Sequence, residues 1–182
     1  LCRLDRIMNE IIKIFSEKEL AIYENYFLYK HRYESNLGDH QAKYNSHKYG
    51  DHLAECLLAS LVSVIEDKTN LSLYPTYSMY RIYTYGESLF EHTDRPECEI
   101  SVSINIGSSG EDWPLIIEKK EYNLKPGEGV IYKGTEQKHG RNNFKGDFHI
   151  QLLLHFVNKN GPYANKIFDG RPALGCDKLE RK

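Results

Sequence analysis

Three side chains of this sequence have the types and spacing of a mononuclear metal site. His92 and Asp94 form a His-x-Asp tripeptide, and His139 follows 45 residues after Asp94. Two residues apart in an extended segment, His92 and Asp94 project from the same face of the chain. Two imidazoles and one carboxylate can occupy one face of an octahedral Fe(II) and leave positions open for an oxidant and O₂. Zinc hydrolases use the same residue types, so the ligands alone do not decide which metal is bound.

The residues from Leu71 onward have the patterns of β-strands, which would position this motif. Alternation and β-forming residues predict strands at residues 77–83, 100–106, 113–117, 130–132 and 148–157. His92 and Asp94 follow the first of these strands, and His139 precedes the last. Several short strands separated by turns favour a closed or sandwiched all-β core.

The residues before 72 have a helical pattern instead. Apolar residues recur at helical spacing in two groups, namely Ile7, Ile11, Ile14 and Phe15, then Leu20, Tyr23, Phe27 and Leu28. Residues 36–50 are polar and contain glycine, which predicts a loop. Asp51 is expected to cap a second helix that ends near Asn70. The expected apolar face of this helix consists of Leu53, Cys56, Leu57, Leu61, Val64 and Ile65.

The composition limits the classes of protein to consider. A length of 182 residues, with 40% hydrophobic and 27% charged residues, is typical of one globular domain. Twenty-four basic residues against 26 acidic ones give no reason to expect general binding to nucleic acids or membrane surfaces.

The cysteines and the N-terminus bear on the cellular compartment. Cys2, Cys56, Cys98 and Cys176 are scattered without a CxxC pair, which argues against a Cys-rich zinc site and against a disulfide framework. No apolar block resembles a signal peptide or approaches the roughly 18 residues of a membrane span. We therefore expect a cytoplasmic, reducing location. The start at Leu1 rather than Met indicates that the natural chain begins further upstream.

The order of these motifs resembles the Fe(II)/2-oxoglutarate-dependent oxygenase superfamily, and within it the prolyl-hydroxylase-like branch. The resemblance covers residues 80–158. Its first elements along the chain are a Tyr-x-x-Gly strand end at residues 83–86, the His-x-Asp motif, the alternating strand and an apolar strand. A turn and strand at residues 124–132, His139 and the last strand follow in that order.

The resemblance implies a fold that is mainly β with flanking α. Its centre would be a double-stranded β-helix, that is, a jelly-roll or cupin-like barrel, with the N-terminal helices packed on its outer face. We expect one oxygenase domain at residues 1–182. It would consist of a helical support region at 1–71, a jelly-roll core at 72–160 and an extended C-terminal tail at 161–182.

The resemblance also implies the reaction. His92, Asp94 and His139 would hold Fe(II), and 2-oxoglutarate would chelate the iron and leave as succinate and CO₂. With O₂, the enzyme would hydroxylate an unactivated C–H bond of a substrate. That substrate would be a prolyl or other side chain of a protein or peptide, a free amino acid or another small molecule.

One position departs from the family pattern. Relatives place an Arg or Lys about ten residues after the distal histidine, where it binds the far carboxylate of 2-oxoglutarate; this sequence has His149 there. A protonated His149 could bind that carboxylate. Arg141 and Arg95 are alternative cations, and an arginine would make a bidentate, charge-assisted contact.

Strand parity adds further candidates for the cosubstrate site. It places His149 and Gln151 on the polar face of the last strand, opposite an apolar face that packs against the helices. By the same parity Asn105 faces the interior, at a position where relatives make a polar contact to the cosubstrate. Tyr83 matches the strand tyrosine that contacts the cosubstrate in the prolyl-hydroxylase branch.

Two other classes of function remain open at the level of sequence. A cupin-like protein could hold a metal without turnover, and the departure at His149 gives weight to that reading. A nucleic-acid-repair oxygenase would need clustered Lys or Arg for phosphate contacts, and the near-neutral charge without a basic stripe counts against it.

Overall fold

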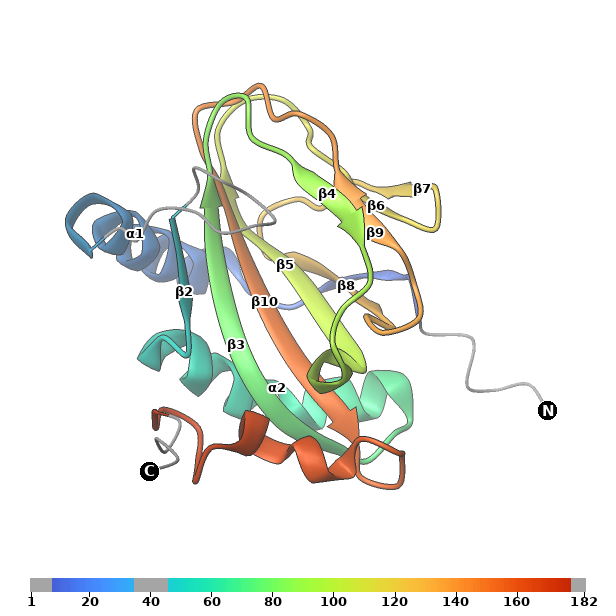
Figure 1. The fold of residues 1–182 in the computed structure, drawn as a ribbon. Coiled ribbons are helices and arrows are strands. Elements are labelled where there is room, and N and C mark those ends of the chain that lie inside the picture. The colour runs from blue at the N-terminus through green and yellow to red at the C-terminus, as the bar shows by residue number, and fades with distance from the viewer. Residues whose placement is uncertain (1–7, 35–45, 178–182) are drawn as a thin grey trace.

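The computed structural model describes residues 8–34 and 46–177, in which the strands form two antiparallel sheets (Figure 1). The larger sheet contains, in spatial order, β1 (Ile11–Lys13), β8 (Glu128–Tyr132), β5 (Ile100–Ser108), β10 (His149–Asn158), β3 (Leu73–Tyr83) and β2 (Ser46–Tyr49). The smaller sheet contains β4 (Leu89–His92), β9 (His139–Arg141), β6 (Leu115–Ile117) and β7 (Lys120–Tyr122). The helices are α1 (Glu17–Glu34) and α2 (His52–Thr69), with short 3₁₀ segments η2 (Pro96–Cys98) and η3 (Ala164–Gly170). None of the helices in these ranges is long and apolar enough to cross a bilayer.

Helices α1 and α2 cover one face of the larger sheet (Figure 1). Phe27 of α1 and Leu58 of α2 belong to one buried cluster with the apolar residues of β5 and β10. These strand residues are Ile100, Val102, Ile104, Ile106, Ile150, Leu152, Leu154 and Phe156. The predicted parity of both strands is therefore confirmed, and their polar residues face the opposite side of the sheet.

The ends of α2 follow the sequence signals, but its buried face differs from the prediction. Asp51 Oδ1 accepts hydrogen bonds from the backbone N–H groups of Leu53 (3.0 Å) and Ala54 (3.3 Å), and Asn70 ends the helix in a left-handed conformation. Cys56 and Val64 are exposed. The buried stripe instead contains Ala54, Leu57, Leu58, Leu61 and Ile65, which recur at three- and four-residue intervals.

Two predictions for the N-terminal region are wrong in part. Residues Ile11–Lys13 form a strand that pairs with β8, not a helix, and Ile7 lies outside the described residues. The first helix begins only at Glu17, where the side chain of Glu19 accepts hydrogen bonds from the backbone N–H and the hydroxyl of Ser16. The predicted loop at residues 36–50 ends in β2, which pairs with β3, while residues 36–45 lie outside the described ranges. Both strands are short and at sheet edges, so tertiary pairing decides their conformation.

The C-terminal residues that the structure describes, up to 177, are not the predicted extended surface tail. They contain η3 and two buried charged residues, Asp169 and Arg171. Arg171 Nη2 lies 2.9 Å from Glu55 Oε2 on α2, and Glu55 also accepts a hydrogen bond from the backbone N–H of Ser78 on β3 (2.8 Å). A buried ion pair thus anchors this segment to α2 and β3.

Replacement of Arg171 by Ala should therefore destabilise the protein strongly. It would leave Glu55 buried without its cation, which costs about 3–5 kcal/mol. Arg32→Ala is the control, because Arg32 is exposed on α1 and its loss should change the free energy of unfolding by at most about 0.5 kcal/mol. Urea unfolding of both variants measures the difference. Equal stabilities of the two variants would show that the ion pair does not hold the C-terminal segment.

Candidate metal centre

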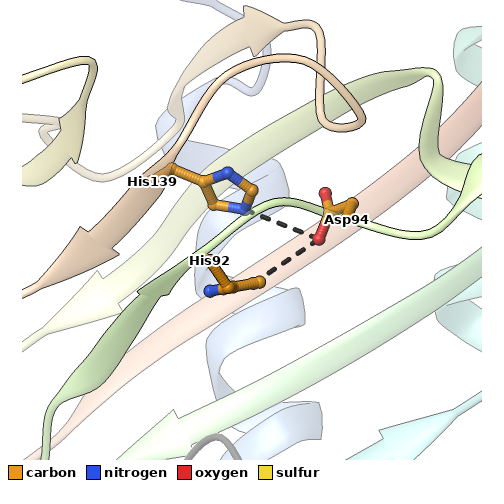
Figure 2. Close-up of side chains that lie close together, drawn as sticks. All are labelled: His92, Asp94 and His139. Atoms are coloured by element: carbon orange, nitrogen blue, oxygen red, sulfur yellow. Dashed lines mark ion pairs between the residues drawn. The ribbon is translucent and has the colours of Figure 1, made fainter.

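His92, Asp94 and His139 meet where the smaller sheet ends next to the loop after β4. Antiparallel pairing of β4 with β9 places His92 opposite His139, and Asp94 follows His92 by two residues. The Nε2 atoms of His92 and His139 each lie 3.5 Å from Asp94 Oδ1, and Figure 2 shows both rings turned toward this carboxylate. Ligands bound at about 2.1 Å to one octahedral ion are about 3 Å apart. The spacing of these three donor atoms is close to that requirement.

Hydrogen bonds fix the tautomers of both histidines. His92 Nδ1 lies 2.7 Å from the carbonyl oxygen of Phe90, and His139 Nδ1 lies 2.9 Å from that of Gln137. A carbonyl only accepts, so each Nδ1 carries the proton and each neutral ring keeps its lone pair on Nε2. This arrangement is common for metal-bound histidines, in which the second nitrogen donates to a carbonyl or carboxylate.

Asp94 is held as a carboxylate. Burial by itself raises the pKa of Asp94, but the proximity of His139 and His92 outweighs it and holds this pKa well below the ordinary value. The backbone N–H of Asp94 donates to the carbonyl of Gly134 (2.8 Å), and Ser101 Oγ lies 3.2 Å from Asp94 Oδ2. A Cβ atom at Gly134 would collide with the Asp94 carboxylate, so this close approach requires glycine. The donor set and its surroundings fit a divalent metal ion.

A cavity of about 350 Å³ connects the three ligands to the polar face of the larger sheet. Its walls include residues from β3, β5 and β10 on one side and from β6 and β9 on the other. Both apolar and charged side chains line it, so it can take a ligand with polar ends.

Arg141 is a buried cation in the wall of this cavity. Its guanidinium donates to the backbone carbonyl of Trp113 and to Gln151 Oε1 (2.6 Å), and it stacks 4.5 Å from the centre of the Trp113 ring. Among the described residues no carboxylate pairs with it. Burial lowers the pKa of Arg141 to about 10, so it remains charged at neutral pH. A buried charge without a counter-ion is costly, which indicates that an anionic ligand compensates it.

The structure disfavours the predicted role of His149 as the cation for the cosubstrate. His149 Nε2 lies 2.7 Å from Gln151 Oε1, an acceptor, so Nε2 carries the proton of a neutral ring. Burial, followed by repulsion from Arg141, lowers the pKa of His149 to about 3. The ring packs edge-on against Trp113 and is not among the residues that line the cavity.

The other predicted cosubstrate residues divide into two groups. Tyr83 and Gln151 line the cavity, and Gln151 also donates to Ser103 Oγ (2.8 Å). Asn105 does not line it, because its Nδ2 donates to the carbonyl of Leu124 (2.7 Å). Arg95 lines the cavity, but both of its terminal nitrogens pair with Asp169 (2.8 and 2.9 Å), so its charge is already compensated.

Arg81, Cys98 and His155 also line the cavity, and sequence reasoning assigned none of them a role. Arg81 lies on β3 two residues before Tyr83 and therefore on the same face, so the parity that identified Tyr83 also predicts Arg81. His155 follows from the same argument on β10, four residues after Gln151. Cys98 lies in η2, and no periodic pattern points to it.

No protein-family model and no curated protein matches this sequence. Solved structures do match its fold. A prolyl-4-hydroxylase from Pseudomonas putida superposes with a TM-score of 0.68 at 15% identity, over 82% of this chain and 91% of its own. The non-haem α-ketoglutarate-dependent epimerase SnoN of nogalamycin biosynthesis gives 0.69 at 10% identity, over 95% and 89%. A Trichoplax adhaerens prolyl hydroxylase in complex with a hypoxia-inducible-factor peptide gives 0.62 at 14%, over 84% and 85%.

These matches show that the chain has the fold of solved 2-oxoglutarate-Fe(II) oxygenases, prolyl hydroxylases among them. Identities of 10–15% carry no information on substrate. The reaction of this chain therefore has to be inferred from the residues of its own site.

Replacement of either histidine ligand by Ala should abolish tight binding of one Fe(II) per chain. Each variant loses one of three protein ligands, while the fold keeps its core. Anaerobic isothermal titration measures the binding, and His52→Ala is the matched control because His52 is exposed on α2. Unchanged affinity in His92→Ala and His139→Ala would place the metal elsewhere.

Proposed function

We propose that this chain is an Fe(II)- and 2-oxoglutarate-dependent dioxygenase that hydroxylates an unactivated C–H bond. One observation carries the proposal: the His92, Asp94 and His139 ligands share a cavity with Arg141, a buried cation that has no counter-ion among the described residues. A dicarboxylate that chelates the metal at one end and meets the guanidinium at the other satisfies both features. The fold that this chain shares with oxygenases of this kind supports the assignment.

We further propose that residues 72–160 form a double-stranded β-helix. Without β1 and β2, the larger sheet has the order β8-β5-β10-β3 and the smaller β4-β9-β6-β7. Successive strands from β3 to β10 thus alternate between the sheets, except that β6 and β7 both lie in the smaller sheet, which is the strand order of a jelly roll made of two Greek keys. This order explains why the ends of β4 and β9 bring the metal ligands together.

Arg141 is the proposed anchor for the far carboxylate of 2-oxoglutarate. Gln151 Oε1 and the Trp113 carbonyl hold the guanidinium in place, and the Trp113 ring stacks on it. Arg81 and Tyr83 line the same cavity and would contribute further polar contacts. When bound, Fe(II), 2-oxoglutarate and O₂ would supply the oxidising chemistry, and 2-oxoglutarate would leave as succinate and CO₂. The protein would bind them and orient them toward the substrate.

The substrate belongs to this proposal only by analogy with the neighbours. The Trichoplax neighbour was solved with a peptide, and two of the three neighbours described above are prolyl hydroxylases. A prolyl or other side chain of a protein or peptide is therefore the first class to test, and a small molecule is the second.

The general reaction can be tested without the substrate. Anaerobic addition of Fe(II) and 2-oxoglutarate should produce a visible metal-to-ligand charge-transfer band, and exposure to air should then release succinate slowly. His139→Ala should show neither signal. A wild-type protein that binds Fe(II) but gives no band and no succinate would be a cupin-like metal-binding protein rather than an oxygenase.

Arg141 can be tested without iron or turnover, because Trp113 is the one tryptophan of the sequence and stacks on it. Titration of the metal-free protein with 2-oxoglutarate should change the tryptophan fluorescence. Arg141→Gln should weaken this binding at least about tenfold, the effect of losing one charge-assisted contact of about 1.5–3 kcal/mol. 2-Oxobutyrate, which lacks the far carboxylate, should bind wild type as weakly as 2-oxoglutarate binds the variant.

His149→Ala is the decisive comparison for this assignment. It should leave the affinity for 2-oxoglutarate within a few-fold of wild type. Loss of affinity in His149→Ala together with wild-type affinity in Arg141→Gln would return the role to His149. Arg141→Lys keeps the positive charge, and it takes the place of Arg141→Gln in this comparison if the glutamine variant does not fold.

A further inference from the structure

Asp94 also belongs to a second group of potential metal ligands. One ligand atom each from Asp94, Cys98 and His155 lies within 4.8 Å of the other two. All three residues line the cavity, and Cys98 and His155 are 1% and 4% exposed. Neither Cys98 nor His155 has a part in the oxygenase proposal above. Their convergence on the partly buried carboxylate of Asp94 is therefore a feature that this proposal does not explain.

Hydrogen bonds prepare His155 to bind a cation. Ser101 Oγ lies between Asp94 Oδ2 (3.2 Å) and His155 Nδ1 (3.0 Å). The Asp94 carboxylate and the carbonyl oxygen of Cys98, which is also 3.2 Å from Ser101 Oγ, only accept, so the hydroxyl donates to one of them and His155 Nδ1–H donates to the hydroxyl. This tautomer leaves the lone pair of His155 on Nε2.

The surroundings of Cys98 favour a bound thiolate once a cation is present. Tyr77 Oη lies 3.0 Å from Cys98 Sγ and can donate its proton to the sulfur, while the guanidinium of Arg95 stacks 4.5 Å from the centre of the Tyr77 ring. In the absence of a cation, burial raises the pKa of the Cys98 thiol. Binding would therefore break the S–H bond, release the proton to solvent and form a sulfur–metal bond.

We propose that Asp94, Cys98 and His155 form a second cation site, selective for a thiophilic divalent ion such as Zn²⁺. A thiolate, an imidazole and a carboxylate suit Zn²⁺ or Co²⁺ and do not suit Mg²⁺ or Ca²⁺. The site shares Asp94 with the first group of ligands, in which Asp94 Oδ1 faces His92 and His139. Occupation of the second site by Zn²⁺ thus engages a carboxylate that the iron site requires.

Co²⁺ is the probe for this site, because a thiolate ligand gives Co²⁺ an intense near-ultraviolet charge-transfer band that nitrogen and oxygen ligands do not give. The test uses the double variant His92→Ala/His139→Ala, which loses the first site and keeps Asp94, Cys98 and His155. It should bind one Co²⁺ with the thiolate band, and Zn²⁺ should displace the Co²⁺ and remove the band. Mg²⁺ should not displace it.

Cysteine variants in the same background identify the sulfur. Cys98→Ser should abolish the band, while Cys56→Ser, at an exposed cysteine of α2, should leave it unchanged. Absence of a band in the double variant, or its persistence after Cys98→Ser, would overturn the proposal. If the double variant does not fold, the same comparison is made between wild type and Cys98→Ser with excess Co²⁺, and equal spectra would overturn it. None of these measurements uses 2-oxoglutarate or turnover, so the result is independent of the proposed reaction.

Discussion

The site depends on one register between two short strands. β4 and β9 pair so that His92 lies directly opposite His139, and the carboxylate of Asp94, two residues after His92, lies next to both imidazoles. A shift of one residue would turn one imidazole to the other face of the sheet. The hydrogen bond from the backbone N–H of Asp94 to the carbonyl of Gly134, together with the lack of a side chain at Gly134, fixes the position of Asp94, the third ligand. The rest of the fold serves to keep these strand ends together.

Three arginines show which charges the fold compensates by itself. Arg171 pairs with Glu55, and Arg95 pairs with Asp169, so both hold structural segments in place. Arg141 has hydrogen bonds but no acidic partner in the described part of the chain. Desolvating a charge without compensation reduces stability. A ligand that supplies the missing negative charge during function would offset this loss of stability.

The sequence predicted the parts of this structure that depend on local pattern. The alternation in residues 100–106 and 148–157 predicted β5, β10 and the direction of their side chains, and Asp51 predicted the start of α2. The His-x-Asp motif and His139 were brought together as expected. The short strands β1 and β2 and the anchored C-terminal segment were missed, because partners distant in sequence decide their conformation. His149 was ranked above Arg141 by position in a family pattern, whereas our proposal of Arg141 rests on burial and hydrogen bonding, which that pattern does not reveal.

The most direct test of this account is a crystal structure of the protein grown anaerobically with Fe(II) and 2-oxoglutarate. The account predicts one iron bound by the Nε2 atoms of His92 and His139 and by the carboxylate of Asp94, with the far carboxylate of 2-oxoglutarate against the guanidinium of Arg141. An iron bound by other residues, or a cosubstrate whose far carboxylate meets His149 and leaves Arg141 without an anion, would contradict it.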